Sequence, residues 1–111
     1  MDLLGPIFYS KRFNESVEFY KGLGLKLIKL YENEFATFAF ADGRRLGIKA
    51  AIAPRHIPGS QTMMVKPADI DVLYKHAQEN HWNIIHPLTD EEWGRTFIIT
   101  DPDQNHIEFI V

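Results

Sequence analysis

The spacing of hydrophobic and polar positions follows the same order in both halves of the chain: strand-like, then helical, then strand-like again. In the first half, the apolar stretch Leu3–Tyr9 is strand-like. Phe13, Val17 and Tyr20 then recur with i, i+4, i+7 spacing, which predicts an amphipathic helix. Three further strands are expected at Leu25–Leu30, Phe35–Ala41 and Arg45–Ala50.

The second half repeats this order. Gln61–Lys66 is strand-like, and the apolar stripe of Ile70, Leu73 and Ala77 predicts a second helix. Strands are expected at Trp82–Ile85, Arg95–Thr100 and Asn105–Val111. The connection from Pro87 to Gly94 is expected to be a loop that is longer than its counterpart in the first half.

Local signals mark where these elements begin and end. Asn14 is the expected N-cap of the first helix, and Gly22 and Gly24 close it. Asp42-Gly43 predicts a hairpin between two strands of the first half. The run Asp101–Gln104 predicts a turn between the last two strands.

The repeated order strand–helix–strand–strand–strand predicts an α+β fold. We expect two tandem βαβββ modules, residues 1–50 and 61–111, forming curved mixed sheets around a cavity, with one helix packed outside each sheet. Residues 51–60 contain two prolines and a glycine and are expected to link the modules. A length of 111 residues fits a single domain of this kind.

Composition excludes several classes of protein. With no cysteine, the chain has neither a disulfide framework nor a thiolate metal site. Twelve Lys and Arg against fifteen Asp and Glu, without a long basic tract, argue against nucleic-acid binding. No apolar run approaches the roughly 18 residues of a membrane span, and no signal peptide is evident. We therefore expect a cytoplasmic protein without membrane contacts.

Period-two alternation predicts which strand residues share a face. One set is apolar, for example Phe8, Leu46 and Ile48, and is expected under the helices. The other set contains the candidate ligand-binding residues Tyr9, Arg45, Lys49, Thr62, Met64, Lys66, His106 and Glu108. A solvated sheet face would explain such a pattern equally well. Its recurrence in both halves favours a concave polar cavity.

Two segments resemble the vicinal oxygen chelate superfamily, which includes glyoxalase I, bleomycin-resistance proteins, thiol-transferring fosfomycin-resistance enzymes and extradiol dioxygenases. Ser16–Leu25 is similar to its first-helix pattern, and Trp93–Phe97 followed by Asp101–Phe109 is similar to its C-terminal signature. The resemblance implies paired βαβββ units, usually in a homodimer whose clefts hold a small-molecule ligand. Gln104 stands where the family has a turn glycine, so Gln104 or Asn105 is expected to have a positive φ. His81 stands where a helix-ending glycine is common and suggests a C-cap.

In its catalytic branches the superfamily binds a divalent metal through one ligand from each of four strands. The resemblance places these positions on Gly5, Gly47, Thr62 (Gln61 if the register slips by one) and Glu108. Only one of them is a carboxylate, so no metal or other cofactor is expected. Alternatively, His106 and Glu108 project from one face and could hold one divalent metal ion, completed across a dimer interface.

Other polar residues have structural explanations. His56, His76, His81 and His86 lack convergent spacing and are expected to be structural or exposed. Asp101 and Asp103 belong to a turn, where Asp is favoured by side chain to backbone hydrogen bonds.

A cavity without metal donors is typical of the bleomycin-resistance branch, in which a dimer sequesters its ligand without chemistry. Stacking residues would come from the aromatic set Tyr9, Phe38, Phe40, Trp82 and Trp93, of which Phe38 and Phe40 are expected in the core and Trp93 is the least core-like. Bleomycin is cationic, whereas Arg45, Lys49 and Lys66 outnumber Glu108 on the predicted inner face. We therefore expect a neutral or anionic aromatic ligand or antibiotic.

Two hypotheses of an enzymatic function also stay open. The first is a metal-dependent lyase or dioxygenase-like enzyme that uses Glu108 and His106. The second is a metal-free enzyme with Glu108 as a catalytic general base.

Overall fold

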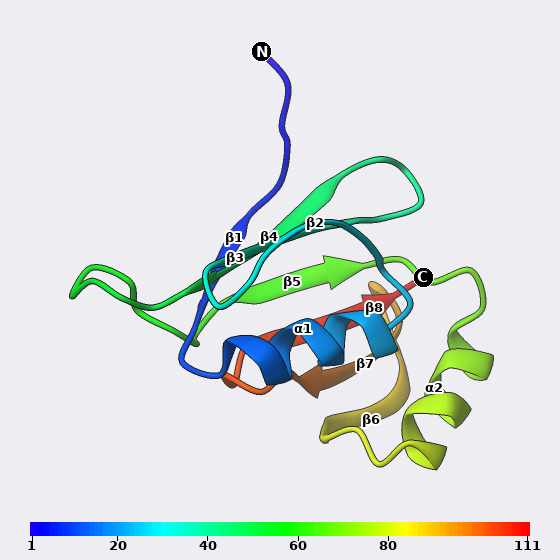
Figure 1. The fold of residues 1–111 in the computed structure, drawn as a ribbon. Coiled ribbons are helices and arrows are strands. Elements are labelled where there is room, and N and C mark those ends of the chain that lie inside the picture. Colours follow the sequence, from blue (N-terminus) through cyan, green and yellow to red (C-terminus); the bar gives the residue numbers. More distant parts are fainter. The chain divides into compact units, whose positions relative to one another are not determined.

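Two βαβββ modules follow one another along the chain in a computed structural model that describes all residues from Met1 to Val111 (Figure 1). They fall in two compact units, Met1–Gly59 and Ser60–Val111. The first unit contains β1 (Ile7–Ser10), α1 (Phe13–Gly22), β2 (Lys26–Tyr31), β3 (Phe35–Ala39) and β4 (Arg45–Ala50). The second contains β5 (Thr62–Val65), α2 (Ile70–Glu79), β6 (Ile84–Glu91), β7 (Gly94–Thr100) and β8 (His106–Ile110).

Each unit forms one four-stranded mixed sheet with the same topology. The strand order is β1-β4-β3-β2 in the first sheet and β5-β8-β7-β6 in the second. β1 is parallel to β4 and β5 is parallel to β8, and every other pair is antiparallel. The predicted fold class, an α+β fold of two βαβββ modules, is confirmed. Neither helix is long and apolar enough to cross a membrane.

One face of the first sheet is covered by α1, which contacts β4. Phe8, Leu46 and Ile48 are buried there as the alternation predicts. The helix contributes the i, i+4, i+7 stripe of Phe13, Val17 and Tyr20, also buried. Phe38 and Ala36 of β3 are fully buried and complete this core. Phe38 is therefore a packing residue, as expected, and Phe40 is half-buried.

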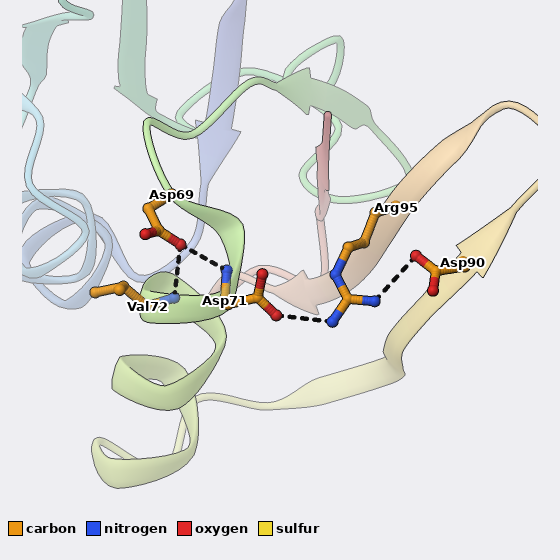
Figure 2. A network of polar contacts seen from close by, with 5 residues as sticks. All are labelled: Asp69, Asp71, Val72, Asp90 and Arg95. Carbon is orange, nitrogen blue, oxygen red and sulfur yellow. Dashed lines mark hydrogen bonds and ion pairs between the residues drawn. The ribbon is translucent and has the colours of Figure 1, made fainter.

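The second sheet packs against α2 in the same way. Its core consists of Ile70, Ala77, Phe97, Ile99, Ile107 and Phe109. Asp69 caps α2 by accepting the backbone N–H groups of residues 71 and 72. Arg95 of β7 then binds Asp71 of α2 at 2.7 Å and Asp90 of β6 at 2.9 Å (Figure 2). This arginine ties the first turn of α2 to two strands of its sheet.

The beginning of the first module differs from the prediction in two places. β1 starts at Ile7 rather than Leu3, because Gly5 has a φ of 143° and breaks the extended strand. Asn14 is not the N-cap of α1. The helix begins at Phe13 after Arg12, whose side chain makes no capping bond, and the Oγ of Ser10 accepts the N–H of Arg12 at 3.0 Å instead.

The predicted long loop from Pro87 to Gly94 is also wrong. These residues continue β6 as far as Glu91, and only a two-residue turn separates β6 from β7. Pro87 is tolerated because β6 is an edge strand and because its pairing with β7 shifts register between His86 and Thr89. A proline that suggested a loop in the sequence therefore marks an irregular edge strand.

The predicted turn before β8 is confirmed in detail. Gln104 has a φ of 67° and occupies the left-handed conformation that the family gives to glycine. Asp101 accepts the backbone N–H groups of Asp103 and Asn105 at 2.9 Å each, so it shapes the turn. His81, which follows the C-cap Asn80, likewise has a positive φ of 55°.

Candidate functional site

The face of the first sheet opposite α1 centres on Gly47. In the strand register, Gly47 lies between Ile7 of β1 and Thr37 of β3. Along its own strand it is flanked by Arg45 and Lys49, whose side chains share its face. Gly47 itself has no side chain, and the side chains of Ile7 and Phe35 lie over it.

A depression lies on this face beside these side chains. Its volume is about 250 Å³, and it is lined by Leu4–Ile7 and by Phe35, Thr37, Arg45 and Gly47. A Cβ atom added at Gly47 would lie 3.1 Å from the side chains of both Ile7 and Phe35, so even a methyl group would crowd the floor. The depression therefore depends on glycine at position 47. We call it the Gly47 depression.

The four strands of this sheet carry four cationic side chains and no carboxylate. Lys26 pairs with Ala39, which faces Arg45, and Lys29 pairs with Thr37, so both lysines lie on the open face together with Arg45 and Lys49. None of the four takes part in an ion pair within the protein. An unneutralised cationic surface of this kind attracts anions.

Tyr9 shares this open face but is already stacked. Its ring lies 4.5 Å from that of His56, with an interplanar angle of 11°. The Nδ1 of His56 accepts the backbone N–H groups of Ile52 and Ala53 at 3.2 Å each. Burial lowers the pKa of His56, and the charges of Arg55 and Lys49 lower it further. His56 therefore has a structural role in the linker, as expected, and one face of the predicted stacking residue Tyr9 is occupied.

The open face of the second sheet brings four predicted residues together. Thr62 pairs with His106, and Met64 pairs with Glu108. The Oγ1 of Thr96 lies 3.0 Å from a Glu108 carboxylate oxygen and 2.8 Å from the carbonyl oxygen of Phe109, so these two acceptors share its one hydrogen.

Two other predicted residues lie away from this group. Lys66 follows β5 and is exposed. Trp93 lies in the turn between β6 and β7 and is 68% exposed. His106 pairs with Thr100 at the far end of β7, six residues from Gly94, so Trp93 and His106 lie at opposite ends of the sheet.

Sequence reasoning missed two residues of this second face. His86 pairs with Ile98, which in turn faces Glu108, and Glu91 pairs with Gly94. The Nε2 of His86 lies 3.9 Å from a Glu91 oxygen, while its Nδ1 is buried without a hydrogen-bond partner. The irregular pairing around Pro87 hides the alternation that would have assigned them to this face.

Charge is divided unevenly between the two units. The first contains nine Lys and Arg against six Asp and Glu, and the second contains three against nine. The open face of the second sheet carries Glu91 and Glu108 and no lysine or arginine from its strands. The excess of cations predicted for one inner face is therefore a property of the first sheet.

The residues present do not fit the four-ligand metal site of the catalytic branches. Gly5 and Gly47 have no side-chain donor, and a Cβ at Gly5 would collide with the backbone carbonyl of Arg45. Thr62 is a poor ligand for a divalent ion, which leaves Glu108. Within either unit, no group of three or more His, Asp or Glu side chains lies together.

Comparisons with known proteins agree with the two-module fold described above. Residues 5–109 match the family model described as the Glyoxalase/Bleomycin resistance protein/Dioxygenase superfamily. A comparison with curated proteins finds no match by sequence.

Three solved structures illustrate the likeness. A lactoylglutathione lyase from Agrobacterium tumefaciens is 16% identical, with a TM-score of 0.81 over 98% of this chain and 92% of that one. A glyoxalase/bleomycin resistance protein/dioxygenase from Alicyclobacillus acidocaldarius is 23% identical, with a TM-score of 0.73 over 97% and 89%. A bleomycin-binding protein complexed with bleomycin is 19% identical, with a TM-score of 0.74 over 99% and 98%. At these identities the likeness establishes a common fold.

Proposed function

The chain belongs to the Glyoxalase/Bleomycin resistance protein/Dioxygenase superfamily, and on this premise we propose that it is a metal-independent protein that sequesters a neutral or anionic aromatic small molecule or antibiotic. The observation that carries the proposal is the open face of the first sheet. It combines the partly apolar Gly47 depression with four unpaired cations and no carboxylate. Such a surface favours anionic over cationic ligands.

The proposal gives each candidate residue a role. Arg45 and Lys49 attract the ligand's negative charge, and Tyr9 offers an aromatic edge beside them. Thr62, Met64, Lys66, Trp93, His106 and Glu108 are the ligand-binding residues proposed for the second module. We further propose a homodimer with the ligand in a cleft, because the superfamily is usually assembled in this way. A cytoplasmic location is proposed as well.

The test is a binding screen on chelator-treated protein, with aromatic probes matched in shape but differing in charge. We expect anionic and neutral members to bind without added metal and cationic members to bind more weakly. Elemental mass spectrometry after incubation with Zn²⁺, Ni²⁺, Mn²⁺ or Fe²⁺ and desalting should find less than about a tenth of an equivalent of metal. About one equivalent per chain, or tight binding of bleomycin, would contradict the proposal.

One observation supports a second function, in which Glu108 is a general base in a metal-free enzyme. Its carboxylate lies on an open sheet face, 3.0 Å from the hydroxyl of Thr96, where a substrate proton could be reached. Turnover of a carbonyl substrate that is lost in Glu108→Gln would support this function, and unchanged turnover in the variant would exclude it. If metal bound instead, His106→Ala and Glu108→Ala would test the alternative metal-dependent enzyme.

A further inference from the structure

We propose that the Gly47 depression binds the acid end of a flat aromatic carboxylate and that Arg45 is the residue that binds the carboxylate. This inference rests on the proposed small-molecule binding function and deepens it by naming the ligand class. It also places the acid end of that ligand on the first sheet, in a depression whose whole lining lies within one unit.

The sheet register surrounds Gly47 with complementary groups. Arg45 and Lys49 lie two residues away on the same strand, at about 6.6 Å per two-residue step. Ile7 and Thr37 lie directly across from Gly47 on the two neighbouring strands, at a spacing of about 5 Å. Arg45 and Thr37 both line the depression, so a ligand seated in it lies beside a guanidinium and a hydroxyl.

The donors around the depression have no partners inside the protein. Neither the guanidinium of Arg45 nor the hydroxyl of Thr37 makes a hydrogen bond to another residue, although neighbouring Arg44 is paired with Asp42 at 2.6 Å. The planar guanidinium presents two parallel N–H groups that match a carboxylate. No Asp or Glu on the four strands competes for them. The absence of internal partners leaves Arg45 available for an external anion.

The walls of the depression select a flat body. Ile7 and Phe35 cover Gly47, since a Cβ there would lie 3.1 Å from each, and together they form a closed apolar wall. Phe35 has a free ring for stacking, whereas Tyr9 is already stacked on His56. A flat ring that lies against this wall brings its substituent toward Arg45, which also lines the depression. The combination indicates an aromatic acid in preference to an aliphatic acid or a neutral arene.

The experiment compares 2-naphthoate with its neutral isostere 2-naphthamide, with affinity measured by calorimetry and location by ¹H–¹⁵N NMR of the full chain. Arg45→Met removes the guanidinium but keeps an apolar stem. Arg44→Met is the matched control, because it makes the same change of net charge at the adjacent, internally paired arginine. The melting temperature of Arg45→Met should equal that of the wild type, since its guanidinium holds no internal contact.

We expect naphthoate to bind more tightly than naphthamide and to shift the amide signals of Ile7, Thr37 and Gly47. Arg45→Met should weaken naphthoate binding by about tenfold or more, since a charge-assisted hydrogen bond is lost, while Arg44→Met changes it less than about twofold. Equal binding of both probes, with no effect of Arg45→Met, would overturn the aromatic-acid assignment but leave the proposed binding function standing. Signal shifts confined to the second unit would also overturn the assignment. If neither probe binds while a matched screen finds another ligand, the assignment alone fails, and if the whole screen finds none, both fail.

Discussion

Replacement of Asn105 by alanine should be among the most destabilising polar-to-alanine changes in the second module. The side chain is only 1% exposed, and it joins the start of β5 to the turn before β8. Its Oδ1 accepts the backbone N–H of Gln61 at 3.2 Å, and its Nδ2 donates to Asp101 at 2.8 Å. Alanine removes both bonds, so a backbone N–H and a buried carboxylate each lose one hydrogen bond.

The cost follows from these two groups. A hydrogen bond between neutral groups contributes about 0.5–1.5 kcal/mol, and one to a charged group about 1.5–3 kcal/mol. Gln61 is exposed and can bind water, so we expect Asn105→Ala to lower the free energy of unfolding by about 2–4 kcal/mol. That is a large part of the roughly 5–15 kcal/mol that holds a domain of this size together.

Urea unfolding followed by circular dichroism and tryptophan fluorescence would measure this loss. Asn80→Ala is the matched control, because the Asn80 amide also donates to the protein, at 2.8 Å to the carbonyl of His76, but in an exposed position where water can replace it. The control should lose less than about 1 kcal/mol. Equal losses in the two variants would refute the reasoning that burial of the Asn105 network sets its contribution.

Three further predictions concern conformation, protonation and ion pairing. Gln104→Gly should raise stability by about 0.5–1 kcal/mol in urea unfolding, because it relieves the left-handed conformation, and a loss would contradict this. Because the fold lowers the pKa of His56, the unfolded chain takes up its proton more readily, so stability should be full above about pH 6.5 and decline below it. In His56→Asn, which keeps an acceptor near Nδ1, urea midpoints at pH 7.5 and 5.5 should differ less than in the wild type, and an unchanged difference would exclude His56 as the cause. Arg95→Met should cost about 0.5–1 kcal/mol at low salt, because the pairs with Asp71 and Asp90 are partly exposed, and a cost unchanged in 1 M NaCl would show that packing dominates.

The order of the elements could be predicted because burial imposes a period on each of them. Arg45–Ala50 was predicted and observed with the same limits, since Leu46 and Ile48 are buried on alternate positions. Where burial is not periodic the prediction failed. Pro87 in an edge strand with shifted pairing has the sequence signal of a loop, and only its neighbour β7 explains why the strand continues.

The open faces could be predicted only where the alternation is unbroken. Arg45 and Lys49 are two residues apart, so they were assigned to one face correctly. Lys26 and Lys29 are three apart and would be assigned to opposite faces. A register irregularity between Leu27 and Lys29 places both on the open face, so this face carries four cations instead of three. Such an irregularity arises from the pairing of two strands, so it cannot be predicted from the sequence of one strand alone.

Different parts of the fold contain the residues that identify the family and the residues that would select a ligand. Tyr20, Asp101 and Asn105 carry the resemblance, and all three are buried in contacts that hold elements together. Gly47 and Arg45 lie on the open side of a sheet, where they can change while the fold is kept. A common fold does not imply a common function. The chain can therefore match the family model over residues 5–109 and still bind a ligand that its relatives do not bind. The ligand is therefore to be sought from the unpaired cations around Gly47 rather than from the signatures that place the chain in its family.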